Sequence, residues 1–221
     1  MSIQQAEGGR ADSSRRQATR ARLIDAAFGV FAENGFHETT IEMIAERADF
    51  TRGAFYSNFA SKEELFFTML EQGHAEVFDQ LEAGLGSLAS PPLGADGSLD
   101  PDALAAFLHA LLGGLPKEPV WHRLDAEFEA LALRDPEIGA RFLALRRRFD
   151  ERLAVLIGGL AEAMGVELTV GPTEAAAVLT AFYVASMRDA LIAGEAEEFV
   201  AGRGAHVRTL ALVVRALVRP R

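Results

Sequence analysis

Cysteine is absent from the 221 residues, so neither a disulfide framework nor thiol chemistry is available to this chain. Histidine is scarce, and its five positions lie far apart, without an H-x-x-x-H pair that could hold a metal on one helix face. The phosphate-binding pattern G-x-x-x-x-G-K-S/T is also missing. These absences argue against an enzyme, and the sequence predicts neither a metal nor a cofactor.

Signals for membranes and secretion are also lacking. We find no apolar run that a bilayer would require, and the N-terminus MSIQQAEGGRADSSRR has no hydrophobic signal core. Hydrophobic residues make up 49% of the chain and charged residues 24%, a balance that can bury a core. The length suits one small domain and one medium domain. We therefore expect a soluble, cytoplasmic protein with no membrane partner.

The net charge of −10 is unevenly distributed along the chain. Residues 10–62 hold eight basic and seven acidic side chains, for a net +1, whereas residues 63–221 hold −10. An acidic body repels DNA, so contact with DNA would be confined to the N-terminal part. The arginines ahead of Leu23 are placed where phosphates or a minor groove could be met. For Arg10, a solvated, disordered arm over residues 1–14 is the simpler explanation.

Residues 39–65 read TTIEMIAERADFTRGAFYSNFASKEEL and contain three helix starts in a row. Two fit the S/T-x-x-E capping box, in which side chains and backbone N–H groups satisfy each other, and the third is a single threonine after a break. The three signals are Thr39 with Glu42, Ser61 with Glu64, and Thr51. Two short helices joined by a tight turn are typical of a helix-turn-helix, whose second helix can enter a DNA major groove.

The polar face of the second short helix carries the functional signal. Its spacing turns Phe55 inward, as expected of any core segment with capped ends. Such a segment does not explain why the opposite face groups Arg52, Tyr56 and Asn58 just before Lys62. This grouping favours the reading of DNA over plain core packing.

The region continues a longer pattern that begins upstream, at RQATRARLIDAAFGVFAENGFHETT over residues 16–40. There an apolar helical stripe stops at Asn34-Gly35. Over about sixty residues, in order and spacing, the chain resembles the DNA-binding domain of the tetracycline-repressor (TetR) family of bacterial transcription regulators. It departs from that family at Asp49-Phe50, where Gly-Val is usual in the turn. Aspartate tolerates the left-handed backbone conformation better than most residues do.

The resemblance implies a role for each matching position. Arg52 and Thr51 would face base edges, and the two small residues after Arg52 would let the helix approach closely. Tyr56, Lys62 and Thr40 would touch phosphates. The implied DNA-binding set is Thr40, Thr51, Arg52, Gly53, Ala54, Tyr56, Asn58 and Lys62.

After Ser61 the apolar spacing is helical throughout, so the fold class is expected to be all-α. A segment rich in Gly, Pro and Ser, residues 84–100, is predicted as a loop, and VELTV at residues 166–170 could be extended. Asp-Pro pairs at 100–101 and 135–136 are helix-start signals. We predict a three-helix helix-turn-helix DNA-binding domain over residues 15–62, followed by a helical effector-binding and dimerisation domain over residues 63–221.

The helix expected over residues 173–193 is apolar on more than one face and must be covered on more than one face. A buried central helix would explain this, and so would a subunit interface. The resemblance implies the interface, with the two C-terminal helices pairing with those of a second copy in a four-helix bundle. A two-fold homodimer would present two recognition helices to a palindromic operator. The predicted interface residues are Val178, Phe182, Ala185, Val207, Leu210, Val214 and Leu217.

The middle helices are predicted to enclose an effector cavity, since helical domains form pockets lined by apolar and aromatic side chains. The candidates are Phe107, Leu111, Trp121, Phe128, Phe142, Phe149, Phe182 and Tyr183, with His109, His122 and Glu127 as polar contacts. Plain core packing is the alternative for any one of these aromatic residues. The aromatic content favours a small, largely apolar effector whose identity the sequence does not give.

The combined hypothesis is a homodimeric, ligand-responsive transcriptional regulator. Repression, with an effector releasing the protein from a palindromic operator, follows only from the family resemblance. Two alternatives stay open: a transcriptional activator, and a helical module that binds a ligand or partner without binding DNA.

Overall fold

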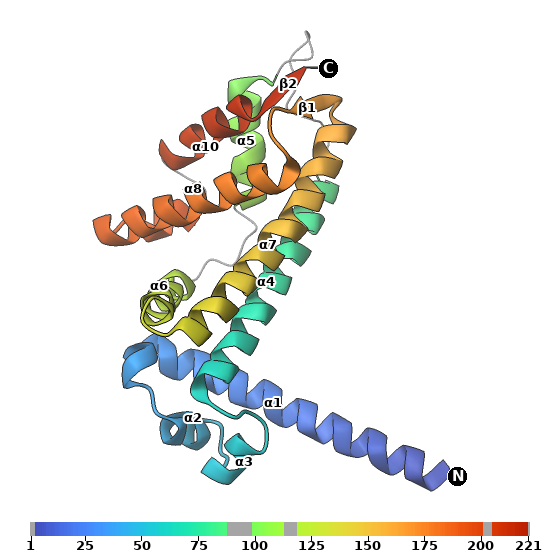
Figure 1. Ribbon diagram of the computed structural model, residues 1–221, viewed down its shortest axis with the longest axis vertical. Helices are drawn as coiled ribbons and strands as arrows, with labels where there is room; N and C mark the ends of the chain where they lie inside the picture. The colour runs from blue at the N-terminus through green and yellow to red at the C-terminus, as the bar shows by residue number, and fades with distance from the viewer. Residues whose placement is uncertain (1–2, 88–98, 113–118, 201–204, 221) are drawn as a thin grey trace. The chain divides into compact units, whose positions relative to one another are not determined.

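The computed structural model describes residues 3–87, 99–112, 119–200 and 205–220, and within these ranges the chain is predominantly helical (Figure 1). The expected all-α class is confirmed. The elements, in order, are α1 Ile3–Glu38, α2 Ile41–Arg47, α3 Arg52–Tyr56, α4 Lys62–Ser87, α5 Pro101–Leu112, α6 Val120–Ala132, α7 Pro136–Ala163, β1 Val166–Leu168, α8 Pro172–Ala193, α9 Ala196–Val200, α10 Ala205–Ala216 and β2 Val218–Pro220.

The chain forms two compact units. The first, here called the N-terminal unit, comprises Met1–Gly73 together with Leu124–Leu131, and the second comprises His74–Arg123 and Ala132–Arg221. The sequence predicts a boundary at residue 62. The structure instead groups the first part of α4 and a part of α6 with the N-terminal helices, because their phenylalanines share one core.

That shared core is an aromatic cluster of fully or almost fully buried rings. The rings of Phe66 and Phe128 stack with centroids 4.3 Å apart, and Phe36 meets Phe128 edge-on at 5.1 Å. Edge-to-face and offset contacts add about 0.5–1.5 kcal/mol per pair to the effect of burial. Phe128 was expected to line an effector cavity. It lies instead in this core, because α6 turns it toward α1 and α4.

The start of α2 differs by one residue from the predicted capping box. Thr40 is the N-cap, and its Oγ1 accepts from the Met43 N–H at 3.2 Å. Thr39 is buried, and its hydroxyl donates to the Gly35 carbonyl at 2.7 Å, so it closes the preceding turn instead of capping the helix. The other caps are confirmed: Thr51 Oγ1 accepts from the Ala54 N–H at 3.1 Å, and Ser61 Oγ accepts from the Glu64 N–H at 3.1 Å.

The turn between α2 and α3 contains the left-handed residue that the sequence suggests. Asp49 has φ of 59°, the one positive φ among the described residues other than glycine. Arg22 supports this turn from α1: its guanidinium lies 4.5 Å from the centroid of the Phe50 ring and donates to the Ala48 carbonyl at 2.7 Å. The aspartate and the arginine together allow α3 to follow α2 after only four residues.

A second arginine fastens the other end of α3. Arg20 lies 4.1 Å from the centroid of the Phe59 ring and donates to the Asn58 carbonyl. Arg20 and Arg22 were both expected where phosphates could be met. Their contacts are internal, because α1 passes behind both short helices and these carbonyls need donors.

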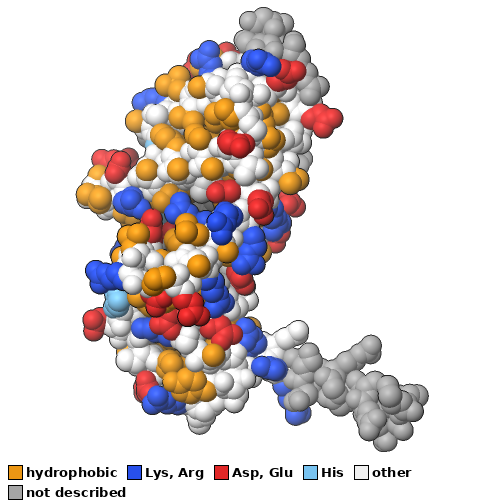
Figure 2. Space-filling view, viewed as in Figure 1, with side chains coloured by type: hydrophobic (Ala, Val, Ile, Leu, Met, Phe, Trp, Pro, Cys, Tyr) orange, Lys and Arg blue, Asp and Glu red, His pale blue; other side chains and the backbone are white. Residues whose placement is uncertain are grey.

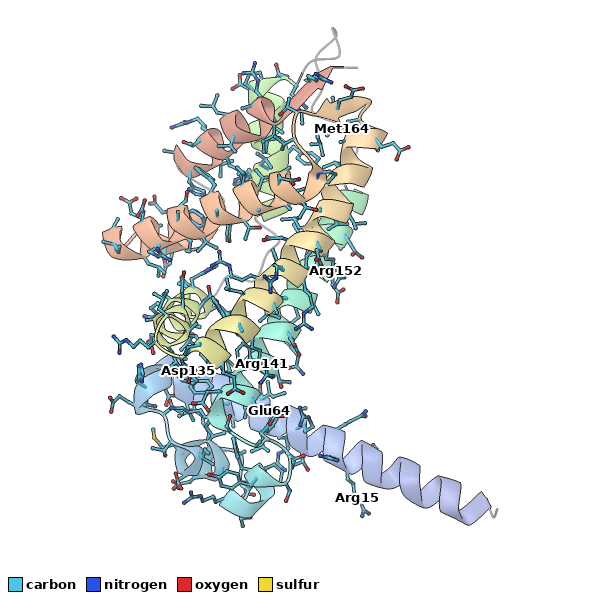
Figure 3. All side chains as sticks on the ribbon, in the orientation of Figure 1. Arg15, Glu64, Asp135, Arg141, Arg152 and Met164 are labelled. Atoms are coloured by element: carbon cyan, nitrogen blue, oxygen red, sulfur yellow. The ribbon has the colours of Figure 1, made fainter. Side chains whose placement is uncertain are left out.

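Helix α1 begins at Ile3, within the segment 1–14 that the sequence predicts as a disordered arm. Farther on, Arg15 is exposed on α1, and its side chain projects away from the neighbouring helices (Figure 3).

The second unit is built from α5, α7, α8, α9 and α10, the later part of α4, the first turn of α6 and the two short strands. The predicted Asp135 cap is present, with Oδ1 accepting from the Glu137 N–H at 2.9 Å, and Asp100 accepts from the Ala103 N–H at 2.7 Å. β1, which covers part of the segment predicted as extended, pairs antiparallel with β2 in register Val166↔Pro220. The short helix α9 has no counterpart in the sequence prediction.

Helix α8 corrects one sequence-based statement. By length and composition alone it is apolar enough to cross a membrane, although the sequence reading found no such segment. Only 22% of its most apolar window is buried within this chain. Much of its apolar surface is therefore uncovered.

A turn after Gly35 connects α1 to α2, and Lys62 at the start of α4 holds it. The Lys62 ammonium donates to the carbonyls of Phe36 at 2.6 Å, Thr39 at 2.7 Å and His37 at 3.4 Å, and lies 4.4 Å from the centroid of the Phe36 ring. Burial lowers the pKa of Lys62 from its usual value, an effect that Glu63 partly offsets. The lysine therefore acts as a fixed donor for backbone carbonyls.

We predict that Lys62→Met lowers the free energy of unfolding by about 1–3 kcal/mol, because the stem remains while partly buried carbonyls lose their charged donor. Denaturant unfolding of the full chain measures this. Arg15→Met is the matched control, since it removes one exposed positive charge from α1 and should change stability by less than about 0.5 kcal/mol. Equal stability of the two variants would show that Lys62 does not hold the turn.

Candidate nucleic-acid interface

An open hollow of about 330 Å³ lies on the N-terminal unit, between α2, α3 and the first turn of α4. Four of the predicted DNA-binding residues line it: Thr40, Arg52, Tyr56 and Lys62. The polar face of α3 therefore faces open space, as a recognition helix requires. Acidic and basic side chains are interspersed on the face of the molecule that Figure 2 shows.

Arg52 is the cation most directly presented at this hollow. Its Nη1 lies 2.8 Å from Glu42 Oε1, and its Nη2 donates to the Tyr56 hydroxyl at 3.4 Å. The Tyr56 hydroxyl and then the Glu42 carboxylate raise the pKa of Arg52 above its usual value. Because 63% of the Arg52 side chain remains exposed, the guanidinium is both paired and accessible.

The two small residues after Arg52 suit a close approach of the helix. A Cβ added to Gly53 would meet only Thr51 Oγ1, at an ordinary 3.7 Å, so the protein's own packing does not require glycine there. Gly53 is exposed and Ala54 half-buried. The small size of both residues leaves the helix backbone accessible to a ligand.

Asn58 has a structural role that differs from its predicted one. Its Nδ2 donates to the Ala54 carbonyl at 2.8 Å, one turn earlier, and so completes the end of α3. Its Oδ1 is buried and has no hydrogen-bond partner among the described residues. Lys62 likewise lines the hollow, but its donors point at the carbonyls of the Gly35 turn. For these two residues the geometry favours structural support over contact with DNA.

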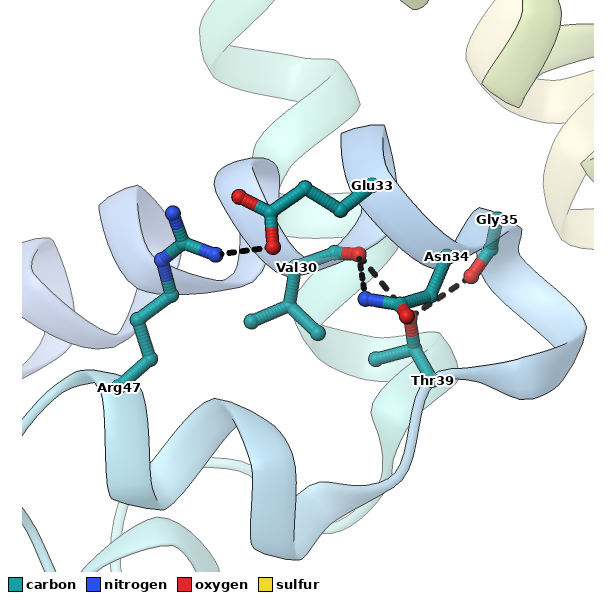
Figure 4. A network of polar contacts seen from close by, with 6 residues as sticks. All are labelled: Val30, Glu33, Asn34, Gly35, Thr39 and Arg47. Carbon is teal, nitrogen blue, oxygen red and sulfur yellow. Dashed lines mark hydrogen bonds and ion pairs between the residues drawn. The ribbon is translucent and has the colours of Figure 1, made fainter.

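An exposed ion pair connects α2 to α1 (Figure 4). Arg47 Nη1 lies 2.7 Å from Glu33 Oε2, and this hydrogen bond lowers the pKa of Glu33. On the same stretch of α1, the Asn34 amide donates to the Val30 carbonyl at 2.9 Å. Arg47 is therefore committed to α1, which leaves Arg52 as the cation of these two helices that faces the hollow.

Glu42 and Glu127 have partners within this unit, Arg52 and the Phe36 N–H, that the sequence does not predict. Glu42 was assigned to a capping box, and its contact with Arg52 connects two helices across a turn. Glu127 was assigned to an effector cavity, but its Oε2 accepts from the Phe36 N–H at 2.7 Å. No local spacing signals a contact of this kind, because 91 residues separate its two members.

The predicted effector-cavity residues are distributed over separate apolar clusters. Phe107 and Phe182 pack against Leu104, Leu108, Val207 and Leu210. Leu111 and Phe149 pack against Phe78 and Leu81, and Tyr183 packs against Met187 and Phe199. Phe142 is buried, whereas Trp121 is half-buried. The structure does not bring these side chains together as one wall.

The residues predicted as polar contacts of the cavity, His109, His122 and Glu127, lie in different surroundings. His122 lies beside Tyr183, with ring centroids 5.9 Å apart. Burial lowers the pKa of His122 to about 4 and raises the pKa of Tyr183 to about 12, so both groups are neutral near pH 7. His109 is exposed at the surface of α5. His122 is thus half-buried in the second unit, beside Tyr183.

The predicted interface residues divide into two groups. Val178 is 46% exposed and Ala185 is also exposed, so both lie on an outer face of α8. Val207 and Leu210 are buried against α5 of the same chain, because α10 packs on α5. The other three, Phe182, Val214 and Leu217, are half-buried.

The N-terminal unit matches known proteins in sequence. Residues 23–69 match the pattern of the family described as "Bacterial regulatory proteins, tetR family". The HTH-type transcriptional regulator TtgR of Pseudomonas putida is 45% identical over 65 residues, 29% of this chain and 30% of TtgR. The fatty acid metabolism regulator protein of Bacillus subtilis (strain 168) is 29% identical over 69 residues, 31% of this chain and 36% of that protein. The matched region thus spans about a third of the length of these relatives.

Similarity to solved structures extends over the whole fold. A TetR transcription regulator from Haloarcula marismortui ATCC 43049 has a TM-score of 0.64 at 17% identity, covering 92% of this chain and 100% of that one. SmeT, the repressor of the Stenotrophomonas maltophilia multidrug efflux pump SmeDEF, has a TM-score of 0.57 at 24% identity and covers 92% of each chain. The sequence match over the helix-turn-helix and the shared fold agree. Residues 23–69 thus match the DNA-binding part of the tetR family of bacterial regulatory proteins, and the whole chain has the fold of solved TetR regulators.

Proposed function

We propose that this protein is a DNA-binding transcriptional regulator whose helix α3 enters the major groove of duplex DNA. The observation that carries the proposal is the open hollow on which Arg52 and Tyr56 of α3 converge with Thr40 of α2. The aromatic core and Lys62 hold these helices from behind, so little ordering would be needed on binding. A rigid helix with an exposed arginine suits the reading of a guanine by two parallel hydrogen bonds.

We further propose that the protein represses transcription. SmeT is described as a repressor, and this chain shares its fold. A protein bound to a promoter blocks polymerase by occupying the same DNA, which requires no additional activating surface. An activator would instead raise transcription from its own target promoter in cells. A reporter assay distinguishes the decrease expected of a repressor from the increase expected of an activator.

The first prediction tests the DNA-reading helix. Arg52→Ala should weaken binding to the operator by about 1–3 kcal/mol per half-site and relax its sequence preference, because a bidentate base contact is lost. The operator is first located by footprinting on the promoters of the protein's own gene and its neighbours. Binding isotherms on operator and unrelated duplexes then measure the effect.

Arg208→Ala is the control for this measurement, since it removes an exposed arginine from α10, in the second unit. It should leave both affinity and preference almost unchanged. A parent protein that binds none of these duplexes would favour a helical ligand-binding module without DNA binding. Unchanged preference in Arg52→Ala would show that another residue reads the bases.

We propose that the protein acts as a homodimer formed through α8. Its outer face presents a stripe of exposed apolar and small residues at spacings of three, four and seven, namely Val178, Ala181, Ala185 and Ile192. Ile192 is 80% exposed, and Leu212 on α10 is 60% exposed. Small residues let two helices approach closely, and a two-fold axis would bring the same stripe from each copy together. Such a dimer would present two α3 helices to half-sites about one DNA turn apart.

A charge on this stripe is expected to break the dimer without unfolding the chain. Val178→Glu places a carboxylate on a side chain that is 46% exposed in the single chain, yet would be buried between two copies. Sedimentation at micromolar concentration should find Val178→Glu monomeric with its helical circular dichroism retained. The matched control is Val155→Glu on α7, where the valine is 74% exposed and outside the proposed interface. A dimer of unchanged stability in Val178→Glu would exclude this face.

We also propose that a small organic effector binds in the second unit. Besides its aromatic side chains, this unit holds buried polar oxygens without hydrogen-bond partners among the described residues: Gln80 Oε1 on α4, Asp150 Oδ1 on α7 and Thr180 Oγ1 on α8. Buried polar atoms are usually paired, so unpaired ones call for an explanation, and a donor on a ligand would satisfy them. The effector would thus be largely apolar, with at least one hydrogen-bond donor.

If such an effector releases the protein from DNA, operator DNA must weaken effector binding by the same factor. A releasing compound is sought by screening organic molecules for loss of operator retention. Calorimetric titration of that compound, with and without saturating operator, should then give affinities that differ by about 5–150-fold, the usual range of such coupling. Equal affinities would show that the compound releases DNA by another route.

A further inference from the structure

Glu42 and Arg52 form an ion pair at the mouth of the hollow on the N-terminal unit. Glu42 lies in the first turn of α2, and Arg52 is the first residue of α3. The distance from Arg52 Nη1 to Glu42 Oε1 is 2.8 Å, and both residues line the hollow. Their side chains are 63% and 56% exposed, so the pair contributes little to the stability of the fold.

Tyr56 completes the arrangement on the other side of the guanidinium. Its hydroxyl accepts from Arg52 Nη2 at 3.4 Å, and the Arg52 Cζ lies 5.5 Å from the centroid of its ring. The two terminal nitrogens of Arg52 therefore have different partners on different helices. This fixes the direction of a long side chain that would otherwise sample many rotamers.

Two other cations of this region, Lys62 and Arg47, have partners elsewhere. Lys62 lines the same hollow, but its ammonium is directed at the carbonyls of Phe36 and Thr39. Arg47, one turn beyond Glu42 on α2, pairs with Glu33 of α1. Glu42 is thus available to act on Arg52.

We infer that Glu42 is a specificity-determining residue, which holds the Arg52 guanidinium in one direction on the DNA-facing surface and opposes its contact with phosphates. The inference rests on the proposed DNA binding and assigns it a further residue. An unpaired arginine at the end of α3 would be attracted by any phosphate, whatever the sequence. A guanidinium already held by a carboxylate gains less from a phosphate. A base edge with two acceptors in the right place still offers two directed hydrogen bonds.

The carboxylate also acts directly on DNA. Its negative charge repels phosphates of every duplex to a similar extent, so this part of its effect lowers affinity without changing preference. Only the part that acts through Arg52 changes the ratio of operator affinity to non-specific affinity. These two parts can be separated, because removal of a different carboxylate from the same helix reproduces the first part alone.

The test is a comparison of Glu42→Gln with Glu46→Gln. Glu46 is exposed on α2, one turn beyond Glu42, so both substitutions remove one negative charge from the same helix. Binding of the full chain is measured on the footprinted operator and on a scrambled duplex of the same length, at fixed salt. Glu42→Gln should lower the ratio of the two affinities by about two- to five-fold, the range expected for an exposed ion pair. Glu46→Gln should raise both affinities similarly and leave the ratio unchanged.

A double-mutant cycle with Arg52→Ala shows whether the effect passes through the arginine. In the Arg52→Ala background, Glu42→Gln should no longer alter the ratio. The inference is overturned if Glu42→Gln behaves like Glu46→Gln, or if its effect on the ratio persists without Arg52. A parent chain that fails to bind any operator would overturn the proposed function itself, a different and recognisable result. Circular dichroism and thermal unfolding of each variant verify that the chain remains folded.

Discussion

The charged end of Lys62 holds the carbonyls of the turn between α1 and α2, and the geometry of the candidate DNA surface depends on this contact. Gly35, with φ of 77°, kinks α1 three residues before its end at Glu38, and polar groups of the backbone that follows are paired with side chains. Lys62 satisfies the carbonyls, Glu127 accepts from the Phe36 N–H, and the Thr39 hydroxyl donates to the Gly35 carbonyl. With these groups paired, the turn delivers α2, and therefore α3, in one fixed position.

Four of the eight basic residues in the N-terminal unit, Lys62 among them, contact other groups of the same unit. Arg20 and Arg22 hold the ends of α3 and α2, and Arg47 fastens α2 to α1. Arg52 is left facing the hollow, and Arg15 projects from α1. The count of eight basic residues over residues 10–62 thus exceeds the number of cations that DNA could meet. In such a protein, recognition would depend on the direction of a few side chains more than on total charge, which is why the partner of Arg52 matters.

Capping and turn residues in the sequence predicted the local structure well, but they did not predict contacts between residues far apart in the sequence. The caps at Thr51, Ser61 and Asp135 and the left-handed Asp49 follow from neighbours within a few residues, so the sequence suffices. The roles of Lys62 and Glu127 depend on carbonyl and amide groups 23 to 91 residues away, which no spacing rule reveals. The apolar periodicity predicted which face of each helix is buried, but it did not predict which helix packs on that face. For that reason Phe128 was assigned to a cavity although it belongs to the N-terminal core, and Val207 to an interface although it packs on α5.

Helix α4 contributes to the core of both units. Phe66 and Phe67 lie in the aromatic core of the N-terminal unit, whereas Phe78 packs with Phe149 in the second. Along the helix, the change from one unit to the other falls at Gly73 and His74. Bending an uninterrupted helix costs hydrogen bonds, so a displacement that begins at Phe78 would carry Lys62 with it unless the helix yields. Glycine in a helix interior is less favourable than alanine by about 1 kcal/mol, so Gly73 is a weak point of the helix. For the effector proposed above, we infer that α4 is the element through which its binding in the second unit would act on Lys62, and the stiffness of this helix at Gly73 would limit that action.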